Sequence, residues 1–134
     1  MFQAAHVLIN WCFKNADLLK NSTVLELGSG VGLCGIAVSL MCRPLRYIFS
    51  DCHPAVMNAL VENVKINSGV EGHNDDDSLN LPPLNDRIMW SGKLSDCNVA
   101  IAHLPWEDII EQQLAAALAP NFVIASGSYC IYYT

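Results

Sequence analysis

Hydrophobic residues recur every three to four positions at the start of the chain, which predicts a helix between Phe2 and Leu19. The short apolar run from Val24 to Leu27 predicts a strand. Apolar residues continue from about Gly32 to Cys42 and suit a second helix, which Arg43-Pro44 should end. A strand, a glycine-rich turn and a helix in this order are typical of the first unit of a nucleotide-binding α/β sheet.

The rest of the chain continues to alternate between strand-like and helix-like patterns. Strands are expected at Arg46–Asp51, Asn98–Leu104 and Asn121–Ser126, with Ile88–Trp90 extending or preceding the second, and helices at Ala55–Asn67 and Trp106–Leu118. This alternation favours a parallel sheet with right-handed crossovers. The fold class expected is therefore α/β, with about four parallel strands and flanking helices.

Two finer features belong to the middle of the chain. On the helix expected at Ala55–Asn67, Leu60, Val64 and Ile66 should mostly share one apolar face with Val56. The polar stretch from Gly69 to Asp86 is predicted to be a solvated loop. Its three consecutive aspartates lack the glycine and the ligand spacing of an EF-hand, so we expect no metal site there.

Composition narrows the class of protein. The 134 residues suffice for one domain with a modest core, and 52% of them are hydrophobic. No run approaches the roughly 18 apolar residues of a membrane span, and the N-terminus lacks the features of a signal peptide. A net charge of -6 argues against a nucleic-acid groove, which needs clustered Lys and Arg. We therefore expect neither a membrane nor a nucleic acid as partner.

The six cysteines indicate a reduced compartment. They form no C-x-x-C pair, and no histidine lies at zinc-finger spacing. Several fall inside apolar runs, where Cys acts as a small hydrophobe. An intracellular protein without a metal is the interpretation that these features favour.

The chemistry is concentrated in the turn after the first strand. Gly28, Gly30 and Gly32 stand at alternate positions, where glycine permits a tight turn and close approach of a ligand. The letters from Gly30 to Gly35 also satisfy the dinucleotide fingerprint, but Glu26 would place a carboxylate near a pyrophosphate. A carboxylate suits a cation better, and S-adenosylmethionine carries an ammonium and a sulfonium. We therefore favour S-adenosylmethionine over a nicotinamide dinucleotide.

A second carboxylate stands at the end of the next expected strand. Asp51 follows the glycines by about 20 residues, the spacing at which nucleotide-binding α/β sheets hold ribose hydroxyls. Asp51 could equally cap the helix that begins near Pro54, and the two roles are compatible.

These residues resemble a known family. The segment from Glu26 to Gly32 resembles the first motif of class I S-adenosylmethionine-dependent methyltransferases, and with Phe2, Asn63 and Asn67 it resembles the seven-strand methyltransferase 16 family. The run from Met41 to His53 looks like the group that methylates a lysine of eukaryotic elongation factor 2. The resemblance covers nearly the whole chain apart from residues 69–97.

The resemblance implies a Rossmann-like sheet, S-adenosylmethionine as cofactor, and methylation of a lysine on a translation elongation factor in the cytoplasm. Residues 1–134 would form a single, incomplete domain, the cofactor-binding half, truncated at both ends. It also implies roles for particular residues. Glu26, Gly28, Ser29 and Gly30 would hold the methionine end, Asp51 the ribose, and Trp106, Ala125 and Phe2 would complete the pocket.

Two departures from the family pattern bear on activity. Pro105 stands where the family usually has Asp, and the residues after Ala125 are Ser126, Gly127 and Ser128 where the family has an Asp near the methyl-accepting amine. The catalytic residues are therefore unknown. The alternative hypothesis is a catalytically inactive fragment that keeps a cofactor pocket or a partner surface. The sequence predicts neither the target lysine nor the oligomeric state.

Overall fold

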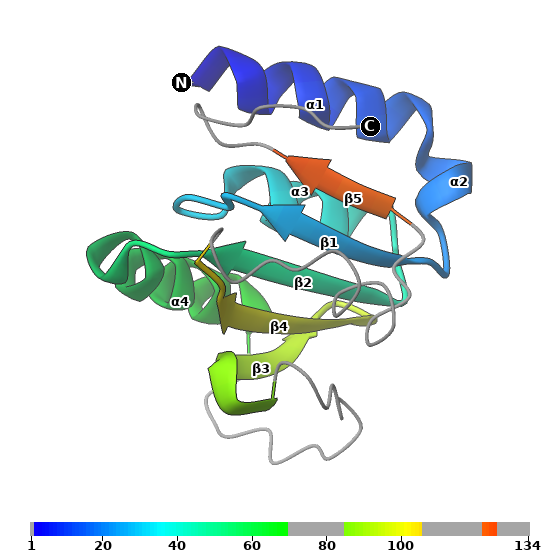
Figure 1. Cartoon of the computed structure of the whole chain (residues 1–134). Coiled ribbons are helices and arrows are strands. Elements are labelled where there is room, and N and C mark those ends of the chain that lie inside the picture. Colours follow the sequence, from blue (N-terminus) through cyan, green and yellow to red (C-terminus); the bar gives the residue numbers. More distant parts are fainter. Residues whose placement is uncertain (1, 70–84, 106–121, 126–134) are drawn as a thin grey trace.

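The computed structural model describes residues 2–69, 85–105 and 122–125 (Figure 1), and side chains within these ranges except those of residues 2–4, 85 and 125. The elements in chain order are α1 (Phe2–Lys14), α2 (Ala16–Leu19), β1 (Thr23–Leu27), α3 (Leu33–Met41), β2 (Arg46–Asp51), α4 (Pro54–Ser68), the 3-10 helix η1 (Asn85–Arg87), β3 (Ile88–Leu94), β4 (Cys97–His103) and β5 (Phe122–Ala125).

The described strands form one sheet in the order β3-β4-β2-β1-β5. Strands β4, β2, β1 and β5 are parallel, which confirms the predicted α/β class. The short Ile88–Trp90 segment is the beginning of a separate strand, β3, which pairs antiparallel with β4. A two-residue connection at Ser95-Asp96, with Ser95 at φ 55°, joins the two strands, and left-handed backbone suits such tight hairpins.

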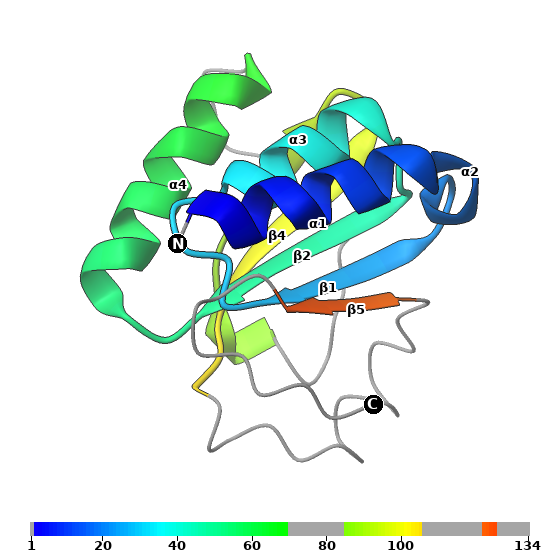
Figure 2. The same ribbon diagram turned by 90° about the horizontal axis from the view of Figure 1, so that it is seen from above.

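Helices α1, α3 and α4 lie on one face of the sheet (Figure 2). The main core between them includes Tyr47 and Phe49 of β2, both fully buried, with ring centroids 4.8 Å apart. Gly35 of α3 lies directly over these rings, and a Cβ there would come within 2.2 Å of Phe49 and 2.6 Å of Tyr47. The absence of a side chain at Gly35 thus lets α3 approach β2 closely.

The opposite face of the sheet carries a second apolar cluster. It consists of Leu25, Ile48, Ala100, Ala102 and Leu104, all at most 3% exposed. No helix among the described residues lies on this face, and the helix expected at Trp106–Leu118 falls outside the described ranges. Both faces of β1, β2 and β4 are therefore apolar, as expected for the central strands of a parallel sheet.

The helices differ from their predicted forms in two places. The first helix breaks at Asn15, whose side chain donates a hydrogen bond to the carbonyl of Trp11 at 2.8 Å, and α2 follows as one turn. The prediction for Ile66 was wrong: it is 75% exposed, and the buried residues of α4 are Met57, Leu60 and Val64. Those three follow spacings of three and four, whereas Ile66 lies two positions after Val64, round the helix from the core.

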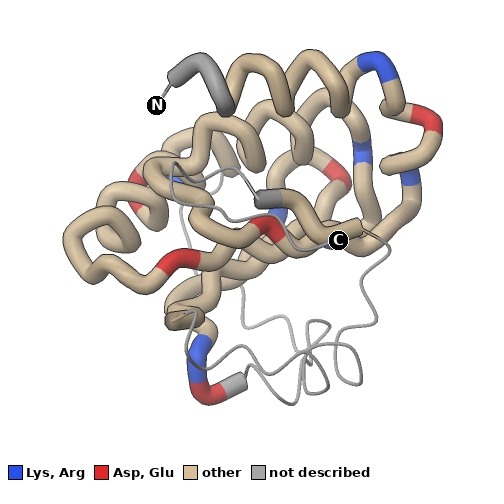
Figure 3. Tube along the Cα trace, turned by 45° about the horizontal axis from the view of Figure 1, so that its top comes forward, with Lys and Arg blue, Asp and Glu red and all other residues tan. Residues whose placement is uncertain are grey.

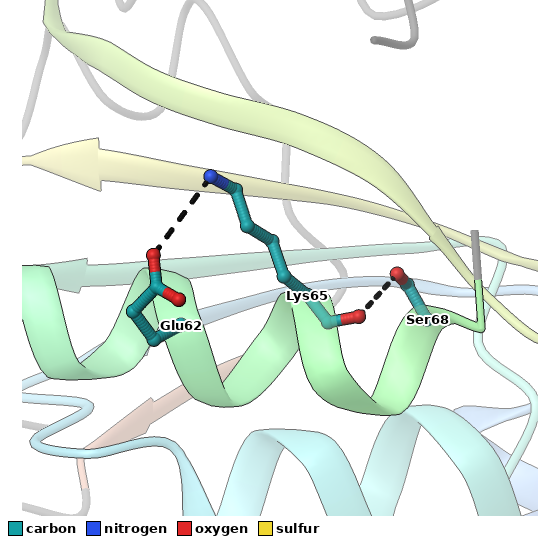
Figure 4. A network of polar contacts seen from close by, with 3 residues as sticks. All are labelled: Glu62, Lys65 and Ser68. Atoms are coloured by element: carbon teal, nitrogen blue, oxygen red, sulfur yellow. Dashed lines mark hydrogen bonds and ion pairs between the residues drawn. The ribbon is translucent and has the colours of Figure 1, made fainter. Parts of the chain in front are cut away.

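Charged residues are scattered among the elements of the described chain (Figure 3), and Glu26 is a fully buried one. On α4, the ammonium of Lys65 lies 3.9 Å from the carboxylate of Glu62, and the Ser68 hydroxyl donates to the Lys65 carbonyl at 2.7 Å (Figure 4). Both charged side chains of this pair are well exposed, so it adds little to stability.

Two further observations concern membrane spans and the cysteines. Within the described ranges, no helix is long and apolar enough to cross a membrane. Four described cysteines are buried, namely Cys12, Cys34, Cys42 and Cys97, which confirms the hydrophobic role expected of several of them, while Cys52 is exposed.

Candidate functional site

The carboxyl ends of the parallel strands converge at one edge of the sheet. The chain passes from β1 outward to β2 and β4, and β5 then lies on the other side of β1. In open α/β sheets, ligands bind outside the carboxyl ends of the strands, where the strand order reverses. Here that point lies between β1 and β5, where Leu27 pairs with Ala125. The glycine-rich turn, residues 28–32, begins directly after Leu27.

The three alternating glycines all have left-handed backbone. Their φ angles are 69° at Gly28, 58° at Gly30 and 99° at Gly32. Residues with a Cβ adopt this conformation only at a cost of roughly 1–2 kcal/mol each. The glycine spacing is therefore a requirement of this turn, and the turn leads into α3, whose N-cap is Gly32.

The glycines differ in what surrounds them. A Cβ on Gly32 would come within 2.7 Å of the Leu60 side chain, so Gly32 lets the turn pack on α4. A Cβ on Gly30 would meet no atom of the described residues within 4 Å. Gly30 therefore borders open space at the strand edge, the surroundings that a ligand lying against the backbone needs.

Hydrogen bonds join the turn to the end of β2. The Ser29 amide donates to the Ser50 carbonyl at 2.9 Å, and the Ser50 amide donates to Ser29 Oγ at 3.0 Å. The Ser50 hydroxyl donates to the Glu26 carbonyl at 2.6 Å. Ser29 is 6% exposed and Ser50 is 1% exposed, so these bonds are shielded from water. Sequence reasoning missed Ser50, because a serine inside an apolar strand carries no distinctive signal.

Asp51 links the glycine turn to the next helix. Its Oδ2 accepts the Gly30 amide at 3.0 Å, while Oδ1 accepts the amides of Cys52 at 2.7 Å and His53 at 3.3 Å. His53 is the N-cap position of α4, and no side chain caps the first amides of this helix, so the predicted capping role of Asp51 was wrong: its bonds end at the amides just before the helix. The carboxylate is half-buried at the strand edge. Each carboxylate oxygen has two acceptor sites, so Oδ2 can accept a further donor from a ligand.

Two more contacts border this edge. The Asn63 side chain of α4 donates to the Val31 carbonyl of the turn at 2.9 Å. His103, at the end of β4, lies beside Asp51 in the ladder, and its Nε2 is 3.1 Å from the Cys52 carbonyl. The turn is thus supported by both β2 and α4.

Glu26 occupies a different environment from Asp51. It is fully buried and projects from the same face of β1 as Val24, toward the layer of α1 and α3. Its carboxylate interacts with the hydroxyl of Tyr47 and the thiol of Cys34. Burial, and next the Glu26 charge, raise the pKa of Tyr47 well above its ordinary value and also raise that of Cys34.

The remaining predicted site residues are described only in part. Phe2 begins α1, and Ala125 ends β5 opposite Leu27, but their side chains are not described. Trp106 lies outside the described residues. Among the groups that the structure describes, no three His, Cys, Asp or Glu side chains are placed to hold a metal ion.

Comparison with known proteins identifies the family. The sequence profile of the family described as "Lysine methyltransferase" matches residues 1–85, more than half of the chain. The chain belongs to this family. The family accounts for the glycine turn and the sheet edge described above, and implies a methyl donor, typically S-adenosylmethionine.

Individual relatives agree with the profile. The chain is 38% identical over 130 residues to the human protein-lysine N-methyltransferase EEF2KMT and 34% identical to its mouse counterpart, in each case over 96% of this chain. It is 32% identical over 62 residues to the calmodulin-lysine N-methyltransferase of Arabidopsis thaliana, which covers 46% of this chain and 20% of that protein. The chain spans 34% of the length of the human and mouse relatives.

Proposed function

We propose that the carboxyl edge of β1, β2 and β5 binds S-adenosylmethionine, and that the chain is the cofactor-binding part of a protein-lysine N-methyltransferase. The observation that carries this proposal is the open space beside Gly30 next to the Asp51 carboxylate, at the point where the strand order reverses. We take residues 1–134 as a single, incomplete methyltransferase-like domain.

The proposed cofactor site joins three strands. Glu26, Gly28, Ser29 and Gly30 would hold the methionine end, and Asp51 would hold the ribose through acceptor sites not used by amides. Phe2, Trp106 and Ala125 would line the remainder of the pocket. Because Ser29 Oγ already accepts the Ser50 amide, its hydroxyl proton is the part available to a ligand.

The residues present suit this cofactor better than a dinucleotide. A pyrophosphate would bring negative charge to a turn that already has Asp51 bonded to the Gly30 amide, which such ligands would otherwise use. Glu26 is a second carboxylate, on β1 two residues before Gly28. Both carboxylates favour a ligand without phosphate and with positive charge.

When bound, S-adenosylmethionine supplies a methyl carbon that its sulfonium makes electrophilic. The chain then has to align an amine with that carbon and exclude water, and alignment removes much entropy from the barrier. A lysine with a pKa of about 10.4 must also lose a proton before it attacks. The described edge supplies the fixed turn, whereas the residues that take this proton are unknown.

We further propose a translation elongation factor as substrate and the cytoplasm as location. Support comes from the relatives named EEF2KMT, which align with 96% of this chain. The acidic balance of the chain, with a net charge of -6, is consistent with a protein substrate rather than a nucleic acid.

An inactive binding fragment is the second candidate. One observation favours it: Gly127 and Ser128 stand where the family pattern has Asp. Under this alternative the cofactor edge is retained and no methyl group is transferred.

Calorimetric titration tests the cofactor. The chain should bind S-adenosylhomocysteine and show weaker or no binding of NADH. Tighter binding of NADH would overturn the proposed cofactor and favour an oxidoreductase. Gly30→Val, which fills the open space, is the matched variant and should lose binding of S-adenosylhomocysteine.

Transfer of tritium from labelled S-adenosylmethionine to elongation factor 2 tests the reaction. The human relative run in parallel provides the reference. Labelling of the factor that depends on Asp51 supports the enzyme, and cofactor binding without labelling supports the inactive fragment.

A further inference from the structure

We propose that Ser50 is a positioning residue that holds the glycine turn in the conformation needed to bind the cofactor. The structural part of this inference is independent of the proposed function. Only the expected effect on affinity for S-adenosylhomocysteine rests on it. Ser50 bonds to Ser29 and to Glu26, and it acts on the turn through these two residues.

The argument begins with the ladder between β1 and β2. Their register runs from Thr23 opposite Arg46 to Leu27 opposite Ser50, where β1 ends. Beyond this point the chain leaves β1 through Gly28, while β2 continues beside β4 to Asp51. The Ser50 amide donates to the Ser29 side chain at 3.0 Å, and the Ser50 carbonyl accepts the Ser29 amide at 2.9 Å.

The hydroxyl of Ser50 adds a third bond, to the Glu26 carbonyl at 2.6 Å. Ser50 therefore contacts the chain on both sides of Leu27 and Gly28, at the start of the turn. It is 1% exposed, so water cannot easily replace these bonds. An alanine at this position keeps the two backbone bonds and removes only the hydroxyl bond.

The expected consequence is local. Without the hydroxyl, the turn should open more often, because the three left-handed glycines give it little intrinsic stiffness. Loss of one hydrogen bond worth about 1.4 kcal/mol should raise the population of the open turn roughly tenfold. Amide exchange across residues 28–32 should accelerate by about that factor.

Hydrogen exchange of the ligand-free 134-residue chain tests the proposal. In Ser50→Ala, exchange should accelerate across residues 28–32 and remain at the wild-type rate in β4. Ser50→Thr, which keeps the hydroxyl, should restore protection of the turn. Ser39→Ala is the matched control, because Ser39 is an equally buried serine on α3, beside Cys97.

A second readout separates this proposal from the proposed function. Affinity for S-adenosylhomocysteine should fall by roughly tenfold in Ser50→Ala and recover in Ser50→Thr. If the wild-type chain binds no S-adenosylhomocysteine, the proposed cofactor is wrong, and exchange alone still decides the role of Ser50. Unchanged exchange of the turn, or equal acceleration throughout the chain, would overturn the positioning role. If Ser50→Ala does not fold, Ser50→Cys, a milder change, replaces it with the same expected outcomes.

Discussion

Two carboxylates from neighbouring strands end up in opposite environments. Glu26 of β1 is fully buried beneath the helices, beside Tyr47 and Cys34. Asp51 of β2 is half-buried at the strand edge, where three backbone amides donate to it. Both residues were expected to contact one cofactor, yet the first lies inside the core and the second lies at its rim.

The difference shows how strand geometry assigns roles. Side chains on a strand alternate between faces, so Glu26 must share the face of Val24 and enter the main core. Asp51 stands at the last position of β2, where the chain turns toward α4 and exposes its amides. A carboxylate inside the core affects folding first, whereas a carboxylate at the edge can affect ligand binding with little effect on the core.

The largest expected effect is on the free energy of unfolding when Glu26 is truncated. Glu26→Ala should lower it by about 2–5 kcal/mol, because a large side chain is removed from a fully buried position. Urea denaturation followed by circular dichroism measures the change. Glu26→Gln keeps the volume and should remain within about 1.5 kcal/mol of the wild type. Equal stability of the Ala variant and the wild type would contradict this.

The two regions should also differ in their tolerance of a methyl group. Gly35→Ala should cost about 1–3 kcal/mol, because the new Cβ would lie 2.2 Å from the Phe49 ring. Gly30→Ala should cost about 1–2 kcal/mol from its left-handed backbone alone, since the new Cβ would meet no atom of the described part of the chain within 4 Å. Thermal denaturation of both variants checks the order, and a larger loss at Gly30 would reverse our view of which region is packed.

At the edge, the expected effect is on affinity. Asp51→Ala should weaken binding of S-adenosylhomocysteine by about 1–3 kcal/mol, the usual cost of leaving hydrogen bonds to a partly buried polar group unmade. The free energy of unfolding should fall by only about 1 kcal/mol, the typical net value of a lost hydrogen bond. Calorimetry and denaturation of the same preparation measure both. Glu26→Gln, measured in parallel, tests whether the buried carboxylate also contributes to affinity. If the affinity of Asp51→Ala equals that of the wild type, Asp51 does not belong to the site.

The last expected effect is a loss of stability at alkaline pH. Burial raises the pKa of Cys12 to about 11 and that of Cys97 to about 12, from 9.0. The unfolded chain releases these protons at lower pH than the folded chain. Stability should therefore be complete below pH 9 and decline toward pH 12. Melting temperatures across this range measure the decline. Cys12→Ala should make this decline smaller, and a flat profile of melting temperature against pH would contradict the prediction.

Several features of the site could be predicted from local sequence. The alternating glycines required left-handed backbone, and all three have it. Asp51 was expected to cap a helix beginning near Pro54; it accepts the amides of Cys52 and His53 just before that helix, but no amide within it. In both cases the physical cause is local, since it depends on the φ angle of one residue or on donors one and two positions away. The roles of Asp51 and Glu26 toward a cofactor stay predictions.

Other features depended on contacts distant in sequence. The strand at Ile88–Leu94 became clear only through its pairing with β4, since its pattern of burial is mixed. Ile66 belonged to an apolar set but faced outward because the helix turns by about 100° per residue. Ser50 carried no signal because its partners, Ser29 and Glu26, lie 21 and 24 residues away.

By itself, the sequence determined the order of strands and helices, the glycine turn and the family, because these follow from periodicity, from backbone sterics and from motif spacing. Only the tertiary structure decided which carboxylate is buried and which lies at the edge. It also decided that Ser50 and Asn63 hold the turn and that Gly30 borders open space. These outcomes depend on which strands pair, and strand pairing brings together residues that no local pattern connects.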